Sequence, residues 1–466
     1  MSPVLRQLAR QLSVRCAIRS GAATLLIASA GCSAGASRLE TTAEEPQLHA
    51  QAPGWTVASP SFAFVNGQWF TGTGFRRGTL YAVNGVFEDQ PPARVDSTID
   101  LAGGFVVPPF GDAHTHNLDA PSTVEALRDA YVREGTFYVQ VLTNTQTGAQ
   151  AARPRFNRPC ALDVVYGNGG LTSTLSHPFM AYEPYAMGLY NSREWRGRAA
   201  EIRKSRLREN DAYWFIDTET DLHAKWPKIL AGRPDLIKIF LLDASESPPP
   251  PADTGLPSGR GLKPSLVPEI VRRAHAVGLR VAAHVETAKD FEIAVQAGVA
   301  IFAHLPGYSM SREERADLRE IGEDAARLAG ERRVVVTPTV NLSLAGRGPD
   351  SAATVERRRD LQRRNLALLM RHGVRVAVGS DWYGQTAWRE IDALRGLGLW
   401  DNLGLLKLWA EATPQAIFPM RRVGRLEPGY EASFLVLSHD PLKELAALRD
   451  IRLRVKQGCV VSPPPA

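Results

Sequence analysis

Short apolar runs alternate with segments of helical spacing through the middle of the chain. The strand-like runs lie near residues 106, 137, 162, 237, 281, 300, 334 and 375, and the helical segments at 121–134, 193–209, 265–277, 288–297, 311–330 and 355–372. Strands that alternate with helices in this way predict a parallel sheet with crossover helices. Eight strands are the number that closes a (β/α)8 TIM barrel. We therefore predict an α/β protein whose barrel occupies residues 105–420.

Both flanks of this region change to short strands and turns. On the first flank, the pairs Asn66-Gly67 and Asn84-Gly85 separate strand-like segments, and such pairs are strong hairpin signals. Further strand patterns lie at 433–437 and 452–460. We expect residues 61–104 and 421–466 to form one small β-sandwich domain, into which the barrel is inserted.

The N-terminus has the pattern of an export signal. Residues 1–31 carry four arginines, no acid and a short apolar run at 22–28, which is typical of a signal peptide and too short for a membrane span. The segment Ala28-Ser29-Ala30-Gly31-Cys32 resembles a bacterial lipoprotein processing site, although Ser29 stands where leucine is usual. We expect export to the periplasm, or anchoring to a bacterial membrane through a lipid on Cys32; plain cleavage and release is the alternative. Residues 32–60, rich in small and polar residues, predict a flexible tether.

Charge and cysteine content change this picture little. The 466 residues carry a net charge of +6, which falls to +2 without the four signal arginines, so we expect no nucleic-acid partner. Cys160 and Cys459 are the cysteines beyond Cys32. They can form a disulfide in an oxidising compartment or stay as two buried thiols.

Polar residues of metal-ligand type stand at the ends of the predicted strands. His114 and His116 end the first apolar run, and because side chains alternate along a strand, both imidazoles point the same way. His284, His304 and Asp381 end later runs, and Lys238 lies within one. Each histidine alone could be a hydrogen-bonded core residue, and Asp381 could cap a turn. A buried, unpaired ammonium at Lys238 is costly, and the whole set at matching strand ends indicates a site.

The set resembles the amidohydrolase superfamily, in the binuclear branch similar to imidazolonepropionase and prolidase. The resemblance rests on His114-Thr115-His116, Leu236-Ile237-Lys238-Ile239-Phe240, Ala282-Ala283-His284, Ala303-His304, Gly379-Ser380-Asp381, and the late Glu-Ala-Thr-Pro-Gln-Ala and Gly-Arg-Leu-Glu-Pro-Gly-Tyr-Glu-Ala segments. It departs at Ser433, where many relatives have aspartate, and at Pro109-Phe110-Gly111.

That resemblance implies a site for two divalent metal ions. His114, His116 and Asp381 would bind the more buried ion, His284 and His304 would bind the other, and a carboxylated Lys238 would bridge them. Zinc is the metal we expect first, with manganese, iron or cobalt as alternatives. Asp381 would be the catalytic residue that moves the proton during attack by metal-activated water.

Loops after the strands carry the candidates for substrate binding. We select His177, Tyr185 and Tyr308. Tyr182 and Glu183 lie in the same loop as the first two, and the loop after the last predicted strand adds Trp382, Tyr383 and Gln385. Each one by itself could simply pack or face solvent. As a group they indicate an aromatic, hydrogen-bonding pocket for a small molecule.

The predicted function is hydrolysis of an amide-type C–N bond, such as that of a cyclic amide or a dipeptide. Hydrolysis of a lactone or a phosphotriester on the same site is an alternative, because the metals activate water in either case. A deaminase fits less well, since His284-Val285-Glu286 has the wrong spacing and Lys238 is present. A catalytically silent envelope lipoprotein is the alternative from another class.

Overall fold

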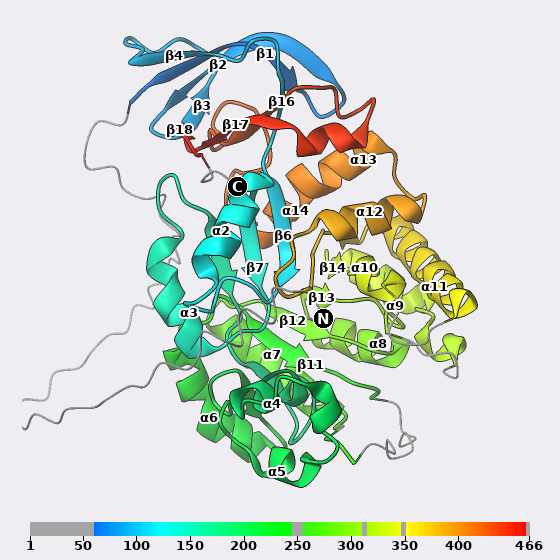
Figure 1. Cartoon of the computed structure of the whole chain (residues 1–466). Helices are drawn as coiled ribbons and strands as arrows, with labels where there is room; N and C mark the ends of the chain where they lie inside the picture. Colours follow the sequence, from blue (N-terminus) through cyan, green and yellow to red (C-terminus); the bar gives the residue numbers. More distant parts are fainter. Residues whose placement is uncertain (1–59, 245–254, 258, 310–314, 346–350, 463–466) are drawn as a thin grey trace, which may run out of the picture. The chain divides into compact units, whose positions relative to one another are not determined.

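The computed structural model describes residues 60–244, 255–257, 259–309, 315–345 and 351–462 (Figure 1). The predicted signal peptide, Cys32 and nearly all of the predicted tether lie outside the described residues. Among the helices that are described, none combines the length and the apolar character needed to cross a membrane.

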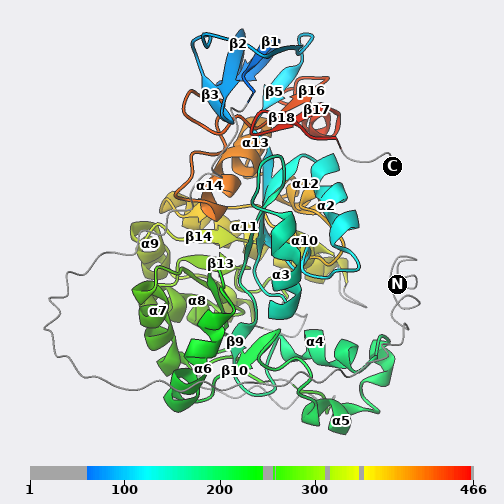
Figure 2. The ribbon, with the colours of Figure 1, turned by 90° about the vertical axis from the view of Figure 1, so that its left-hand side faces the viewer.

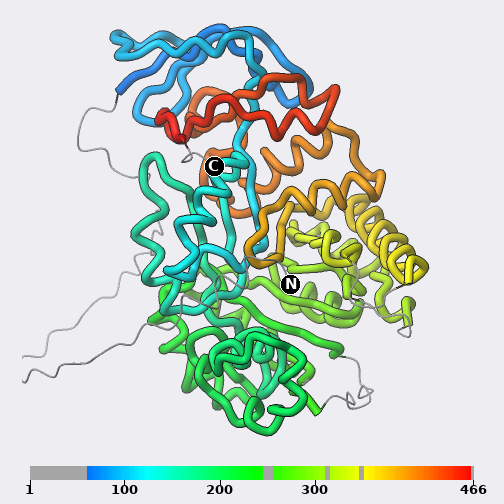
Figure 3. The backbone as a smooth tube through the Cα atoms, in the orientation of Figure 1, coloured from blue at the N-terminus to red at the C-terminus, as the bar shows by residue number. Residues whose placement is uncertain are grey.

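Strands from both flanks form one eight-stranded sheet. It contains β1 (Phe62–Phe70), β2 (Phe75–Val83), β3 (Val86–Glu88), β4 (Ser97–Asp100), β5 (Phe105–Val107), β16 (Phe434–Leu437), β17 (Ile451–Lys456) and β18 (Cys459–Val460). Their order is β18-β17-β16-β5-β1-β2-β3, with β4 paired to β1. The first and last coloured segments accordingly run side by side in Figure 3. The sequence predicts a β-sandwich from these strands, whereas the structure joins them in one hydrogen-bonded sheet.

The Asn-Gly pairs have different roles in this sheet. Asn84-Gly85 makes the predicted hairpin turn between β2 and β3. The hairpin predicted at Asn66-Gly67 is wrong, because β1 runs through this pair with a shift in register. Asn66 has a φ of 58°, so the pair forms a bulge that leaves the strand paired on both sides. The core of the sheet is aromatic: the Phe434 ring lies 4.8 Å from Phe64 and 5.4 Å from Trp69, measured between ring centroids.

Two prolines separate this sheet from the barrel-like region. Residues 106–116 are predicted as one strand, but β5 ends at Val107 and β6 (Phe110–Thr115) begins after Pro108-Pro109. Proline has no N–H to give to a strand ladder, so pairing is interrupted at these positions. β5 consequently belongs to the sheet of the chain ends, although the predicted barrel boundary at residue 105 includes it.

The remaining strands form two parallel sheets. β6, β7 (Thr136–Val141) and β8 (Asp163–Tyr166) make a three-stranded sheet. The other sheet has the order β10-β9-β11-β12-β13-β14-β15 and consists of β9 (Gly170–Thr172), β10 (Tyr213–Phe215), β11 (Ile237–Phe240), β12 (Val281–His284), β13 (Ile301–Ala303), β14 (Val335–Thr337) and β15 (Arg375–Val376).

Hydrogen bonds connect the two parallel sheets at both edges. The third predicted strand corresponds to β8, which pairs with β7, and after residues 167–169 the chain forms β9, which pairs with β10 and β11. The Asp235 amide donates to the Tyr166 carbonyl at 2.8 Å on one side. On the other side the Ala113 amide donates to Val378, and the Asp381 amide donates to His114. This arrangement is consistent with a TIM barrel beside a separate β domain.

Helices follow most of the parallel strands. They are α2 (Val124–Arg133), α3 (Gln146–Ala152), α4 (Phe179–Ala186), α5 (Ala199–Lys204), α6 (Glu219–Ala231), α7 (Val267–Ala276), α8 (Ala288–Ala297), α9 (Glu323–Glu331), α10 (Val340–Leu344), α11 (Ala352–Arg371), α12 (Trp388–Gly396), α13 (Asn402–Lys407) and α14 (Thr413–Ile417). Figure 2 shows α7, α8 and α9 beside β13 and β14. The helices predicted at 193–209 and 311–330 are much shorter, and α6 and α12 are not among the predicted elements.

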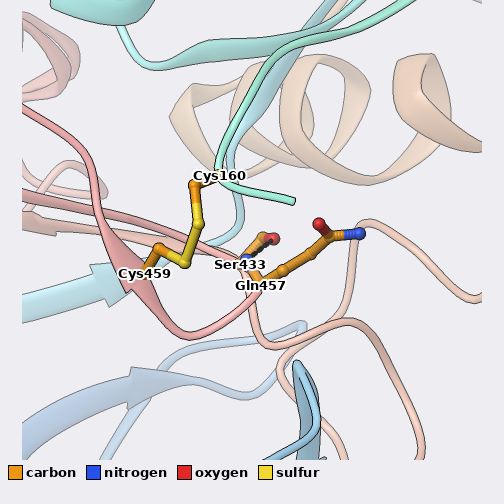
Figure 4. Close-up of a disulfide and its surroundings, with 4 residues drawn as sticks. All are labelled: Cys160, Ser433, Gln457 and Cys459. Carbon is orange, nitrogen blue, oxygen red and sulfur yellow. Dashed lines mark hydrogen bonds between the residues drawn. A yellow bond between two sulfur atoms is a disulfide. The ribbon is translucent and has the colours of Figure 1, made fainter. Parts of the chain in front are cut away.

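A disulfide and a buried ionic cluster join the last strands to the loop before β8. Cys160 and Cys459 are bonded, with Cα atoms 5.5 Å apart (Figure 4), which decides between the two alternatives for this pair. In the cluster, the Asp163 carboxylate lies 2.8 Å from both Arg421 Nη2 and Lys456 Nζ, and Glu431 pairs with the same two cations.

Ser433, the residue that departs from the family pattern, holds the turn beside the disulfide (Figure 4). Its hydroxyl accepts from the Gln457 amide at 2.9 Å and donates to the Glu431 carboxylate at 2.7 Å. In this chain a serine hydroxyl therefore links the turn after β17 to the ionic cluster.

Candidate metal centre

The site begins where β6 and β15 approach each other closely. His114 and His116 lie at the end of β6 and, two residues apart, share one face of the strand. A Cβ atom on Gly379 would lie 2.6 Å from the His114 Cβ and 2.8 Å from its backbone nitrogen. Only glycine permits this approach, which brings the residues after β15 beside the two histidines.

Asp381 lies at the centre of the cluster. Its Oδ1 is 2.8 Å from the Nε2 of His116 and 3.3 Å from that of His114. Its Oδ2 is 3.5 Å from the Nε2 of His304, the residue that directly follows β13. His114, His116 and Asp381 offer ligand atoms that all lie within 4.8 Å of one another, so they could hold one metal ion.

Two of the histidines are oriented through their Nδ1 atoms. Nδ1 of His116 lies 2.8 Å from the Thr143 carbonyl, which can only accept, so this nitrogen carries the proton. Nδ1 of His304 lies 2.6 Å from the Thr339 hydroxyl, which itself donates to the Pro338 carbonyl. In the neutral form of either ring, the nitrogen that carries the lone pair is thus Nε2, on the side of Asp381, which is the tautomer that metal ligation there requires.

His284 joins the cluster from β12. Its ring centroid is 4.7 Å from that of His304, and its Nε2 lies 3.1 Å from the Glu286 carboxylate. The Tyr308 ring stacks on His304 at 3.9 Å with an interplanar angle of 9°. Glu286 and Thr339 were not among the predicted site residues. The His-x-Glu spacing at a strand end was a visible signal for Glu286, but nothing in the sequence distinguished Thr339.

Lys238 is buried in β11 with 1% of its surface exposed. Its Nζ has no hydrogen-bond partner among the described residues and lies 5.2 Å from the Phe240 ring centroid. Burial lowers the pKa of Lys238 to about 7, although Asp381 opposes the shift. A neutral amine can react with carbon dioxide, so this orphaned nitrogen fits a carboxylated lysine.

Burial and charge set opposite pKa shifts within the cluster. Burial holds the pKa of His114 and His304 well below the usual range. Burial also lowers the pKa of His116, but the Asp381 carboxylate and the Thr143 carbonyl raise it overall. For Asp381, burial raises the pKa, and the surrounding histidines more than compensate and hold it well below its usual range. The carboxylate is therefore anionic at neutral pH, as a ligand or a proton acceptor must be.

A second buried carboxylate, that of Asp112, connects the strand of the two histidines to the segment that carries Asp381. Asp112 accepts hydrogen bonds from the Ser380 amide at 2.9 Å, the Ser380 hydroxyl at 2.8 Å and the Tyr131 hydroxyl at 3.0 Å. It thereby ties the β6 histidines to the residue before Asp381. His304 and Asp381 adopt φ values of 75° and 44°, and such uncommon backbone conformations cluster at functional sites.

The predicted substrate residues occupy different surroundings. The His177 ring packs 5.0 Å from Phe240 and 5.1 Å from His284, which places it at the cluster. Tyr308 is there too, stacked on His304.

Tyr185 is 47% exposed and contacts Tyr190 and Trp195. Glu183 is fully buried and accepts from the Leu207 and Arg208 amides, so it holds the α4–α5 segment together. Tyr383, which was only a neighbour of the selected set, stacks on His116 with centroids 5.3 Å apart.

Comparison with family models gives a match over part of the chain. Residues 252–462 match the model of the amidohydrolase family. The matched part includes His284, His304 and Asp381, whereas His114, His116 and Lys238 precede it. No curated protein matches the chain.

Solved structures extend the likeness over most of the chain. A crystal structure of an amidohydrolase is 20% identical, with a TM-score of 0.64, and covers 87% of this chain and 100% of its own. A prolidase complexed with N-methylphosphonate-L-proline is 18% identical, with a TM-score of 0.62 and coverages of 86% and 100%. The A. niger ochratoxinase is 16% identical, with a TM-score of 0.65 and coverages of 88% and 97%. The family model thus matches the C-terminal part of the chain, and these neighbours show that most of the chain shares their fold.

Proposed function

We propose that this protein is a metal-dependent hydrolase that cleaves an amide-type C–N bond in a small molecule. One observation carries the proposal: three histidine Nε2 atoms converge on the Asp381 carboxylate beside the buried, unpaired amine of Lys238. Burying several imidazoles and an amine around one carboxylate is costly unless these groups are paired or bind cations.

The ligand assignment follows the resemblance. His114, His116 and Asp381 would hold one divalent ion, and His284 and His304 a second, with carboxylated Lys238 between them. For the carboxylation, the neutral amine forms an N–C bond to carbon dioxide and releases a proton. Zinc is the ion we propose. Two such ions, when bound, lower the pKa of a shared water and polarise the substrate carbonyl.

The protein's own residues then move the proton and orient the substrate. Asp381 accepts the proton of the attacking water and transfers it to the leaving nitrogen. Its lowered pKa keeps the carboxylate anionic, which the first role requires. His177 and Tyr308 line the cluster on the side of His284 and His304, and we assign them to substrate binding. Tyr185 packs against Trp195 of its own segment, so it would bind only a part of the substrate that extends to this segment.

The proposal also covers the fold and the cellular location of the protein. We propose a closed (β/α)8 barrel, supported by the hydrogen bonds that link both edges of the parallel sheets. We also propose export, supported by the Cys160–Cys459 disulfide, because such bonds persist in oxidising compartments. Labelling with a radioactive fatty acid would mark a lipid-anchored wild type but not Cys32→Ala; a wild type without label would indicate simple release.

Amides come first as substrates because the neighbours include proteins whose titles name prolidase, Xaa-Pro dipeptidase and phenylurea hydrolase. Those activities belong to those proteins, and at such low identities they guide only the choice of compounds. Lactones and phosphotriesters remain the second class, since activated water attacks them equally well.

The deciding experiment is elemental analysis of the purified mature protein, wild type beside Lys238→Ala. Lys289→Ala is the control, because Lys289 is a surface residue paired with Glu292. We expect about two divalent ions in the wild type and the control, and a clear loss in Lys238→Ala. A panel of dipeptides, cyclic amides, ureas, lactones and phosphotriesters then identifies the bond. A wild type that takes up no metal in bicarbonate would overturn the proposal in favour of a silent envelope protein.

A further inference from the structure

Glu286 lies two residues after His284 and its carboxylate is held from the neighbouring loop. Oε1 lies 3.1 Å from Nε2 of His284 and accepts a hydrogen bond from the Tyr308 hydroxyl at 3.3 Å. Oε2 accepts from the Ser309 hydroxyl at 2.8 Å. The Gly307 amide donates to the Glu286 carbonyl at 3.0 Å, which fixes the loop against the end of β12. The carboxylate therefore has a defined position beside the cluster.

Tyr308 connects the same carboxylate to a second histidine. Its ring is stacked on His304 at 3.9 Å and meets the edge of His284 at 5.8 Å. One carboxylate is thus linked to His284 directly and to His304 through an aromatic ring. These are the two histidines assigned to the second ion; His304 also bonds the Thr339 hydroxyl through Nδ1, and His116 bonds the Thr143 carbonyl separately.

We propose that Glu286 is a positioning residue that orients His284 and, through Tyr308, His304 as a ligand pair for the second metal ion. An ionised carboxylate only accepts hydrogen bonds, so Nε2 of His284 carries the proton and Nδ1 carries the lone pair for the metal. Partners of this kind change metal affinity by roughly 10–100-fold. The inference rests on the proposed binuclear site and names the residue that sets occupancy of one half of it.

The test is a chelator titration of the full mature protein loaded with Co²⁺, which reports the affinity of each ion and its visible absorption spectrum. Wild type is compared with Glu286→Ala, with Glu286→Gln and with the control Glu292→Ala, whose side chain pairs with Lys289 on the surface of α8. We expect Glu286→Ala to weaken the second ion by roughly 10–100-fold and to alter its spectrum, with the first ion unchanged. Glu286→Gln should restore much of the affinity, because its amide oxygen still accepts from Nε2 of His284.

The outcomes separate this inference from the proposed function. Two ions bound by Glu286→Ala with wild-type affinities and spectrum would overturn the inference and leave the hydrolase proposal intact. Equal weakening of both ions in Glu286→Ala and Glu286→Gln would also overturn it, since that result describes a general structural role. A wild type without metal would overturn the proposed function itself. If Glu286→Ala does not fold, Tyr308→Phe removes one hydroxyl only, and an unchanged second ion there would count against the link to His304.

Discussion

The Nε2 atom of His116 lies 2.8 Å from Oδ1 of Asp381, while its Nδ1 is bonded to the Thr143 carbonyl. This pair fixes both the orientation of the ring and the charge that it faces. Because the Thr143 carbonyl can only accept, the neutral ring keeps its lone pair on the nitrogen nearest the carboxylate. The same side chains can therefore ligate an ion and hold a proton acceptor beside it.

Asp381→Asn should abolish most of the hydrolysis with little change in stability. The amide keeps the shape of the side chain but loses the negative charge and the ability to accept a proton. We expect kcat/KM to fall by roughly 10²–10⁴-fold and metal content to drop. Activity on the identified substrate, metal analysis and thermal unfolding together check this. Near-wild-type turnover by the variant would remove Asp381 from the catalytic role.

Gly379→Ala should damage the site through packing alone. The new methyl group would lie 2.4 Å from the Thr337 Cγ2 and 2.6 Å from the His114 Cβ, so the segment after β15 must move away. We expect a loss of about 1–3 kcal/mol in the free energy of unfolding, together with reduced metal content. The matched control is Gly396→Ala at the end of α12, where nothing lies within 4 Å of the new atom. The free energies of unfolding of both variants are measured in urea. Equal stabilities would contradict the close approach of Gly379 to His114 and Thr337.

Lys456→Met should be among the more destabilising substitutions outside the site. Lys456 is 1% exposed and pairs with Asp163 and Glu431, so its removal leaves two buried carboxylates that share one cation, Arg421, among the described residues. Breaking such a buried pair costs about 3–5 kcal/mol. Lys289→Met, at a surface pair, should cost less than about 1 kcal/mol. Denaturant midpoints measure both, and similar values for the two variants would show that the cluster contributes little.

Glu390 should make the fold lose stability as the pH rises. It accepts from the Val340 amide at 2.9 Å and the Asn341 amide at 2.8 Å, and burial raises its pKa to about 7. A carboxyl whose folded pKa is raised contributes stability that is complete below its unfolded pKa and is lost as pH rises through the folded pKa. The window is therefore about pH 4.5 to 7, and the contribution is about 3 kcal/mol.

The pH effect is isolated by comparison with a variant that does not titrate. Free energies of unfolding are measured from pH 4.5 to 8 for wild type and for Glu390→Gln. The difference between the two curves should change by about 3 kcal/mol across the window, with wild type losing stability toward high pH. A constant difference would mean that Glu390 titrates normally.

Much of the candidate site could be predicted because metal ligands at strand ends leave local patterns. His114 and His116 are visible as a pair since a strand repeats every two residues, and Lys238 is visible because an amine inside an apolar run is unusual. Asp112 gives no such signal, because its bonds to Ser380 join residues far apart in the chain. No local pattern encodes such a contact.

Some elements of the fold could likewise be predicted from local patterns and others could not. Alternating strands and helices predicted the parallel sheets, and the prolines at 108–109 could have marked the end of β5. The bulge at Asn66-Gly67 could not be told from a hairpin, because both need the same left-handed backbone and differ only in which strands pair. The helices α6 and α12 were missed within polar, charged segments whose packing faces depend on their neighbours.

The sequence by itself determined the kinds of groups available: histidines, a carboxylate and a lysine placed at or within the apolar runs of an α/β chain. Only the tertiary structure decided how they act together. It brought Asp381 between His114, His116 and His304, placed the Thr143 carbonyl behind one ring, and set Glu286 beside His284. The physical reason is that strand spacing fixes directions within one strand, whereas distances between strands depend on packing such as the contact at Gly379.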